Sequence, residues 1–170
     1  MLFRSRNAFS HGSTFAPNEL AMAAGLAMLR ELDEQCLVER SARLGARLLE
    51  LTAPLAERYE VVHEVRGLGL MWAIEFGEPA GSRRHAYRLV DRLQPGLFAQ
   101  FVVVPLFAEH RILSQVAGHG IPVIKGLPPL TIGEEELLPL AEAFAEAIES
   151  ASALPRSLTR FALTAAGLRR

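Results

Sequence analysis

The chain has few cysteines and lysines and no long uninterrupted apolar segment. Its 170 residues contain one cysteine, Cys36, so no disulfide can form within the chain, and such a lone thiol is typical of a reducing compartment. Because no histidine lies beside Cys36, we interpret it as a structural thiol and not as a nucleophile. No apolar run reaches the length of about 18 residues that a membrane-spanning helix needs. The first residues, 1–6, are too poor in apolar side chains for a signal peptide, so we expect a cytoplasmic protein.

Positive charge is supplied almost entirely by arginine. Of 18 basic residues only Lys125 is a lysine, and 19 acidic residues bring the net charge to −1. A charge near zero does not favour binding to nucleic acid or to an anionic membrane, and we expect neither partner. Hydrophobic residues make up 50% of the chain, which favours a packed core over global disorder. The length fits one domain, or one domain and part of another.

A turn-rich segment with two hydroxyl residues lies near the start of the chain. Residues 11–18 have the sequence HGSTFAPN, and Asn18 is a good N-cap for a helix that follows. Hydroxyl groups and unpaired amides at a helix start can hold an anion, so Ser13 and Thr14 are candidates for a phosphate contact. From chemistry alone, an ordinary capped helix start is the favoured interpretation of these residues. Residues 20–32 are apolar on nearly every side, which predicts a helix buried on several sides or at a subunit interface.

The middle of the chain changes from helical to extended periodicity. A helix is predicted from about residue 37, and Pro54 should kink or split it. Its leucines recur on one stripe, and its charged side chains form another face that we expect to be solvated: Leu37, Leu44, Leu48, Leu51 and Leu55, and Arg40, Arg43, Arg47 and Glu50. Residues 60–66 and 70–76 are rich in β-branched and aromatic side chains and predict two strands. The Gly67-Leu68-Gly69 segment between them is a weak phosphate-loop signal, and a tight turn is the simpler interpretation.

The second half of the chain predicts further helices and short strands. A helix should end at Pro95-Gly96, and residues 112–120 and 121–130 indicate two short strands around a turn. Residues 97–108 are apolar throughout, so periodicity alone does not decide between a buried helix and a strand. Acidic residues 134–136 are typical of a helix start, and the helix after them carries one apolar stripe.

Three segments together resemble the class III (fold type I) aminotransferases, which use pyridoxal 5'-phosphate. HGSTF-x-x-N is similar to the family's H-x-S-T-F/Y-G-G-N-P-L-A, although Ala16, Pro17 and Glu19 replace Gly, Gly and Pro. Residues 65–75, VRGLGLMWAIE, resemble V-R-G-x-G-L-M-x-x-I-E, and residues 125–130, KGLPPL, resemble R-x-x-P-P-L with Lys125 in place of Arg. The resemblance extends over residues 8–151 and favours a helix for residues 97–108.

The resemblance implies both a fold and a set of site residues. It implies an α/β (α+β) chain in which residues 1–58 end the large cofactor-binding domain. Residues 59–151 would form the small C-terminal α/β domain with a mostly antiparallel sheet. Residues 152–170 lie beyond the resemblance and carry four arginines and no acid, so we expect a basic, loosely docked tail and not a nucleic-acid or phospholipid arm. Ser13 and Thr14 would bind the cofactor phosphate, Thr14 from the neighbouring subunit of a homodimer. Lys125 would bind a substrate carboxylate, and a purely structural role is the alternative.

The resemblance also implies that a catalytic residue is missing. In the family a lysine that forms a Schiff base with the cofactor precedes the HGSTF motif, and the one lysine here, Lys125, has the context of the small-domain strand. We therefore expect the C-terminal portion of an aminotransferase, with weak or absent cofactor binding by this chain alone. The intact enzyme would move an amino group from a diamine, ω-amino acid or amino acid to a 2-oxo acid. The alternative is an inactive remnant, an interaction module or a subunit completed by another chain.

Overall fold

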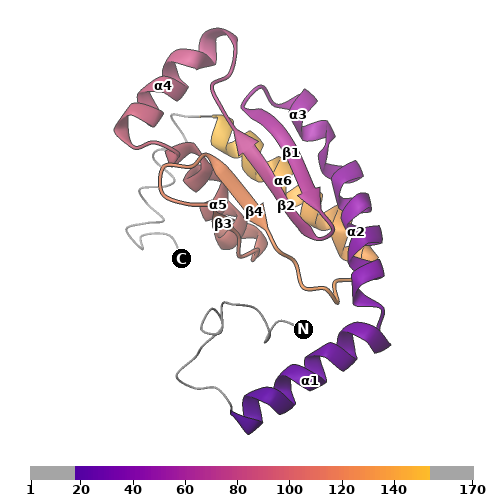
Figure 1. Cartoon of the computed structure of the whole chain (residues 1–170). Helices are drawn as coiled ribbons and strands as arrows, with labels where there is room; N and C mark the ends of the chain where they lie inside the picture. Colours follow the sequence, from indigo (N-terminus) through magenta and orange to yellow (C-terminus); the bar gives the residue numbers. More distant parts are fainter. Residues whose placement is uncertain (1–17, 154–170) are drawn as a thin grey trace, which may run out of the picture. The chain divides into compact units, whose positions relative to one another are not determined.

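The computed structural model describes residues 18–153, which belong to two separate units (Figure 1). The first unit ends at Val38 and the second begins at Glu39. In the first unit the described structure is the helix α1 (Glu19–Glu34) and the short link after it. The Asn18 side chain accepts a hydrogen bond from the Ala21 amide at 3.0 Å, which confirms the predicted N-cap.

The apolar face of α1 is exposed. Leu20 is 80% exposed, Met22 68% and Leu29 60%, and among the described residues no side chain of α1 is buried. The burial that the sequence predicts for this helix stays a prediction. An all-round apolar helix in this state has unpartnered surface.

The second unit alternates helices and strands. Its helices and short 3₁₀ turns are α2 (Leu37–Thr52, which begins at the end of the first unit), α3 (Pro54–Arg58), η2 (Gly81–Arg83), α4 (Arg84–Leu93), α5 (Leu97–His110), η3 (Glu134–Glu136) and α6 (Leu137–Ser152). Its strands are β1 (Val62–Leu68), β2 (Met71–Phe76), β3 (Gln115–Val116) and β4 (Val123–Gly126).

The four strands form one antiparallel sheet in the order β1-β2-β4-β3 (Figure 1). The β1–β2 hairpin turns at Gly69 and Leu70, where the sequence predicts a tight turn. The two short strands predicted within residues 112–130 are β3 and β4. The mixed fold with a mostly antiparallel sheet is thus confirmed.

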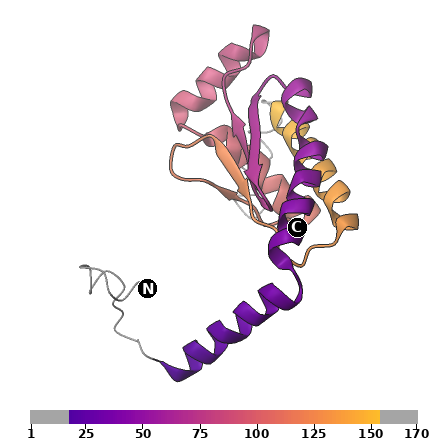
Figure 2. The ribbon, with the colours of Figure 1, turned by 45° about the vertical axis from the view of Figure 1, so that its right-hand side comes forward.

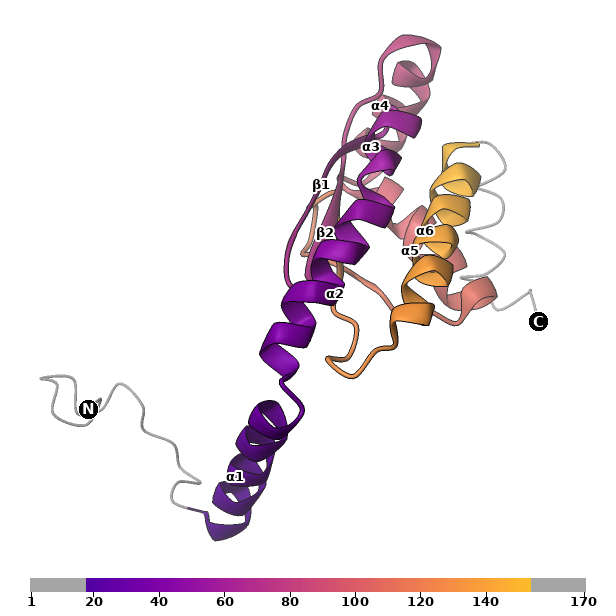
Figure 3. The same cartoon turned by 90° about the vertical axis from the view of Figure 1, so that its right-hand side faces the viewer.

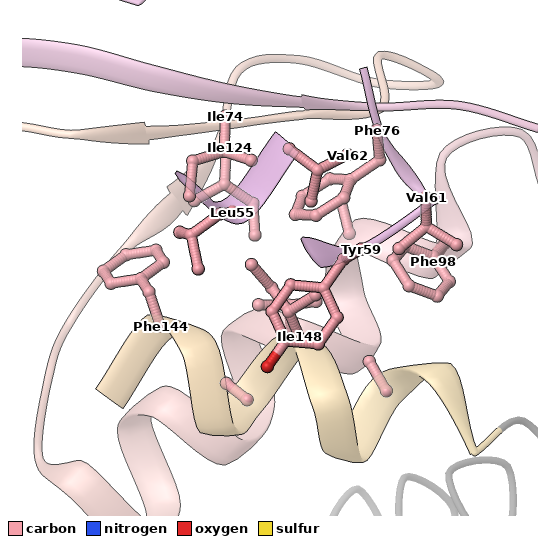
Figure 4. Close-up of a cluster of buried hydrophobic side chains, with 14 of the residues drawn as sticks. Leu55, Tyr59, Val61, Val62, Ile74, Phe76, Phe98, Ile124, Phe144 and Ile148 are labelled. Carbon is pink, nitrogen blue, oxygen red and sulfur yellow. The ribbon is translucent and has the colours of Figure 1, made fainter. Parts of the chain in front are cut away.

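The helices α2, α3, α5 and α6 pack on one face of this sheet (Figure 3). Ile74, Phe76 and Ile124 point from the strands toward Phe144 and Ile148 of α6 (Figure 4). All five side chains are at most 1% exposed, so they form the centre of the core. Full burial of side chains of this size stabilises a fold by about 1.5–3 kcal/mol each.

Two helices illustrate how local sequence sets the elements. Pro54 ends α2 and starts α3, because a proline has no amide donor for the preceding turn and fits the first position of a helix. The predicted leucine stripe is buried at four positions and half-buried at the fifth: Leu37, Leu44, Leu48, Leu55 and Leu51. The apolar segment 97–108 is helical, as α5, and buries Phe98, Phe101 and Val102. Its C-cap Arg111 has a left-handed conformation with φ 60°.

The opposite face of the sheet carries charged side chains, and within residues 39–153 no helix covers it (Figure 2). We call it the outer face. Two-residue alternation along each strand places one set of side chains in the core and the next set on this face. The predicted boundary between residues 58 and 59 stays a prediction, and α2 and α3 belong to the second unit. Among the described helices, none is long and apolar enough to cross a membrane.

Candidate functional site

Lys125 lies on β4, in the interior of the sheet order. It pairs with Ala73 of β2 on one side and with Gln115 of β3 on the other. The adjacent residue Ile124 points into the core and is 1% exposed, so the Lys125 side chain projects from the outer face. Lys125 itself is partly exposed. Strand pairing therefore gives the one lysine of the chain a defined position.

A continuous cross-strand row contains Lys125 and a second cation. The row runs Arg66–Ala73–Lys125–Gln115 across β1, β2, β4 and β3. Neighbouring strands are about 4.8 Å apart, so Arg66 and Lys125 are separated by about 10 Å along the row. Ala73 lies between them and has only a methyl side chain. The outer face therefore presents two cations with a small side chain between them.

Two carboxylates hold the Arg66 guanidinium. Its Nη1 lies 2.5 Å from Glu75 Oε2 and 2.7 Å from Glu64 Oε2. These hydrogen bonds raise the pKa of Arg66 above its usual value, with Glu75 as the larger cause and Glu64 as the second. The Arg66 and Glu64 side chains are about half exposed, and Glu75 is the most covered of the three at 37%. One nitrogen of the guanidinium, Nη1, thus contacts both acids.

Lys125 has no such partner among residues 18–153. No hydrogen bond or ion pair joins its Nζ to any side chain in that range. An ammonium in this state is free to attract a carboxylate, although as a point charge without the planar fork of an arginine. The predicted role of Lys125 stays a prediction, and its position on an uncovered sheet face fits it.

The strand that carries Lys125 is fixed by Trp72 and Gly126. A Cβ placed on Gly126 would lie 2.2 Å from Trp72 Nε1, so only glycine fits there. Trp72 is 2% exposed and packs edge-on against Phe144, with ring centroids 4.9 Å apart. Its Nε1 has no hydrogen-bond partner among the described residues. A core indole thus lies directly beneath the residue that follows Lys125.

The loop after β4 is tied to α2. Arg40 Nη2 donates a hydrogen bond to the Ile132 carbonyl at 2.6 Å, and Arg43 Nη1 lies 2.7 Å from Glu134 Oε2. Arg40 is only partly exposed. The prediction that this charged face of α2 is merely solvated is therefore wrong for Arg40, because its side chain reaches the backbone of a loop far away in the sequence. It ties the loop that follows the K-G-L-P-P-L segment to the helix.

The Gly67-Leu68-Gly69 turn is packed against α2. Gly69 has φ +56°, and a Cβ on Gly45 would lie 2.1 Å from the Gly69 carbonyl oxygen. The Leu70 amide donates a hydrogen bond to Ser41 Oγ at 3.1 Å. Since its backbone is occupied by α2, this turn does not fit a phosphate, and the simpler interpretation as a tight turn is confirmed.

The predicted cofactor residues Ser13 and Thr14 lie outside the described residues. Their phosphate contact stays a prediction. Cys36 is exposed between α1 and α2, and its predicted structural role also stays a prediction.

Two surface hollows of the second unit are not lined by Lys125. Each has a volume of about 430 Å³. One lies at Tyr59 and Arg83, and the other lies at Glu78 and Tyr87. Glu78 accepts hydrogen bonds from arginines of α4, which lower its pKa, so the second hollow has its charge already paired. Neither hollow is continuous with the row that contains Lys125.

Sequence reasoning identified Lys125 but not the residues around it. Arg66, Glu75 and Ala73 belong to two strands that were predicted, yet their shared face depends on the register between those strands. The alternation of Glu64 with Arg66, and of Ala73 with Glu75, was the available signal. The structure brings these residues together with Lys125.

Comparison with known proteins gives one consistent result. Residues 2–148 match the family described as Aminotransferase class-III. The chain is 32% identical over 140 residues to the mitochondrial ornithine aminotransferase of Oryza sativa, covering 82% of this chain and 26% of that protein. It is 34% identical over 139 residues to the 5-aminovalerate aminotransferase DavT of Pseudomonas aeruginosa, covering 79% of this chain and 30% of that protein.

Solved structures agree with the sequence relatives. A transaminase from the marine bacterium Virgibacillus superposes with a TM-score of 0.69 at 26% identity, covering 85% of this chain and 31% of that chain. An ω-transaminase from Pseudomonas jessenii, solved in complex with PMP, gives a TM-score of 0.69 at 25% identity, covering 86% and 30%. The chain thus spans less than a third of the length of these relatives. With its fold, its motifs and its relatives in agreement, the chain belongs to the class III aminotransferase family.

Proposed function

We propose that this chain forms the C-terminal part of a pyridoxal-phosphate-dependent aminotransferase that moves an amino group from a diamine, ω-amino acid or amino acid to a 2-oxo acid. The observation that carries this proposal is Lys125, a cation on the outer face of the sheet with no ion-pair partner among residues 18–153, in the K-G-L-P-P-L segment. Relatives named ornithine, diaminobutyrate and 5-aminovalerate aminotransferases support the donor class. The whole reaction needs the rest of such an enzyme.

In this proposal the chain binds and orients and does not carry the central proton transfer. Pyridoxal phosphate, when bound in the intact enzyme, acts as an electron sink for the carbon that carries the amino group. Ser13 and Thr14 would hold its phosphate through their hydroxyls, Thr14 across the interface of a homodimer. Lys125 would attract the carboxylate of an amino acid or a 2-oxo acid. The Arg40 contact ties the loop after the Lys125 strand to α2, and the Ser41 contact ties the β1–β2 turn to the same helix.

One observation favours a second candidate function. The exposed apolar residues of α1, among them Leu20 and Leu29, are typical of a surface that another polypeptide covers. A subunit completed by another chain, or an interaction module, would have such a surface. In that case the chain would have no transaminase activity without its complement.

Binding and activity assays of the purified chain with pyridoxal phosphate test whether the chain is active alone. We expect weak or absent binding by absorbance and no transaminase turnover. Borohydride reduction followed by peptide mass spectrometry should find no stoichiometric adduct at Lys125. A reducible adduct at Lys125 together with turnover would contradict the assignment of Lys125 to substrate binding. The variant Lys125→Gln is the control for nonspecific reaction at the α-amino group.

A Michaelis analysis tests the substrate role once the chain is complemented. The complement is a polypeptide that carries the cofactor domain with its lysine. The variant Lys125→Gln should raise the KM for a carboxylate-bearing donor about tenfold, as expected for loss of one charge-assisted contact of about 1.4 kcal/mol, and should leave the KM for a simple diamine unchanged. An equal effect on both donors would favour the structural role of Lys125.

A further inference from the structure

Glu75 has the same geometric relation to both cations of the outer face. Arg66 and Lys125 each pair with Ala73, from opposite sides of β2, and Glu75 lies two residues further along that strand. All three side chains project from one face, because residues two apart on a strand share a face. Diagonal neighbours of this kind are within reach of long side chains. The Glu75 carboxylate can therefore be held from either side.

In the structure Arg66 alone holds this carboxylate. Arg66 Nη1 lies 2.5 Å from Glu75 Oε2 and 2.7 Å from Glu64 Oε2, whereas Lys125 has no partner among residues 18–153. The planar guanidinium has five donors and can serve two carboxylates together, which a compact ammonium does less well. Glu64 adds to the advantage of Arg66, because it pairs with Glu75 across the strands and draws the guanidinium to that side.

We propose that Arg66 is a specificity-determining residue, which holds Glu75 away from Lys125 and so leaves the Lys125 ammonium free for a substrate carboxylate. This inference rests on the proposed function, because it takes Lys125 as the carboxylate-binding cation. Without Arg66, Glu75 would pair with Lys125 as an internal carboxylate. The face would then reject carboxylate-bearing substrates in favour of simple amines. Arg66 acts through Glu75 and does not itself contact the substrate.

The single lysine makes the pairing directly measurable. Selective labelling with 15Nζ-lysine gives one side-chain NMR signal, because Lys125 is the only lysine of the chain. The variants are Arg66→Gln and the double variant Arg66→Gln/Glu75→Gln. The matched control is Arg47→Gln, which breaks the exposed Arg47–Glu50 pair of α2 at 2.9 Å. We expect Arg66→Gln to shift the Lys125 signal and slow its proton exchange, the double variant to restore both, and the control to change neither.

A carboxylate titration tests the consequence for binding. Glutarate is added to each labelled variant at constant ionic strength, and the Lys125 signal reports the apparent Kd. Arg66→Gln should weaken glutarate binding about fivefold, the size of one Coulomb contact in water. The variants Glu75→Gln and Arg66→Gln/Glu75→Gln should bind glutarate within about twofold of the parent chain, because neither has a Glu75 carboxylate to compete.

Two results would overturn the inference alone. One is an unchanged Lys125 signal in Arg66→Gln, which would show that Glu75 does not move to Lys125. The other is glutarate binding that is weakened in Arg66→Gln and stays weakened in the double variant Arg66→Gln/Glu75→Gln, which would show that Arg66 binds the carboxylate itself. A third result has a different meaning: if glutarate leaves the Lys125 signal of the parent chain unchanged, the carboxylate role of Lys125 in the proposed function fails, and this inference fails with it.

Discussion

At the scale of single residues, the contact between Gly126 and Trp72 positions β4, the strand that carries Lys125. A methyl group on Gly126 would collide with the indole, which is held against Phe144. We predict that Gly126→Ala lowers the free energy of unfolding by about 1–3 kcal/mol, as overpacking of a dense core does. Urea unfolding measures the effect.

The chain offers a matched control for this substitution. Gly25 in α1 has nothing within 4 Å of an added Cβ, so Gly25→Ala should leave the urea midpoint of the second unit unchanged. It should also favour its own helix by up to about 1 kcal/mol. Equal losses of stability in the two variants would show that the Trp72 contact is not the cause.

Residue chemistry and residue placement differ in how far a sequence predicts them. Lys125 could be identified because it is the one lysine and lies in a recognisable segment. Arg66 and Glu75 could not, because a register shift of one residue would move either side chain to the opposite face of the sheet. The necessity of glycine at position 126 depends on the indole of a neighbouring strand, which no local pattern shows.

At the scale of elements, one hydrogen bond joins α2 to the loop after β4. The variant Arg40→Met keeps most of the apolar stem but leaves the Ile132 carbonyl without its donor. We predict a loss of about 1–3 kcal/mol in the free energy of unfolding, the cost of an unsatisfied, partly buried polar group. Hydrogen exchange should accelerate at amides of residues 130–136 before it does in the strands.

A second arginine on the same helix provides the comparison. In the described part of the chain Arg47 pairs only with Glu50, at the exposed surface, and Arg47→Met should change stability by less than about 1 kcal/mol. Equal losses of stability in the Arg40 and Arg47 variants would show that Arg40 is merely solvated, as the sequence predicts.

Leucines of α1 and α2 differ in burial, which predicts a difference in their contribution to stability. Leu48 of α2 is 0% exposed, so Leu48→Ala should lower the free energy of unfolding by about 2–5 kcal/mol. Leu26 of α1 is 51% exposed, and Leu26→Ala should leave the thermal midpoint of the second unit unchanged. A large effect of Leu26→Ala would mean that α1 has a cover that the described residues do not provide.

Element prediction succeeded where a single physical signal dominated. Pro54 marks the break between α2 and α3, and the leucine stripe gives the face that α2 buries. The helix α5 could not be assigned from periodicity, because its side chains are apolar all round and the packing of the whole unit decides its conformation. The exposure of α1 could not be predicted, since burial depends on partners that a sequence does not contain.

At the scale of the whole molecule, both tyrosines report on the alkaline limit of the folded state. Burial raises the pKa of Tyr87 to about 12, with Asp91 and Glu78 as further causes, and burial also raises the pKa of Tyr59. A raised pKa in the folded state favours the neutral phenol. Its contribution to stability is therefore complete below pH 10, the ordinary pKa of a tyrosine, and is lost as the pH rises toward 12.

We therefore predict that the second unit loses stability between pH 10 and 12. Absorbance at the tyrosinate band should show titration of Tyr87 coincident with unfolding followed by circular dichroism. The variant Tyr87→Phe should weaken this dependence, with Tyr59 as the remaining contributor. Titration of both phenols at pH 10 in the folded chain would contradict the burial of Tyr87.

The chain covers only part of the length of its relatives, yet it contains a hydrophobic core of its own. It spans 26% to 31% of the relatives compared above, yet the second unit has its own buried core. A core of this kind supports an ordered outer face, including the row Arg66–Ala73–Lys125–Gln115. In the function proposed above, this row would form one side of the substrate site, and its charges are already in place in the second unit.

Trp72 provides an optical signal for the position of β4, the strand that carries Lys125. It is the only tryptophan of the chain, it is buried, and Gly126, the residue after Lys125, lies against its indole nitrogen. All tryptophan fluorescence therefore arises from one ring, and its emission maximum depends on whether water reaches that nitrogen. A displacement of β4 would appear as a red shift in unlabelled protein, at concentrations far below those that NMR requires.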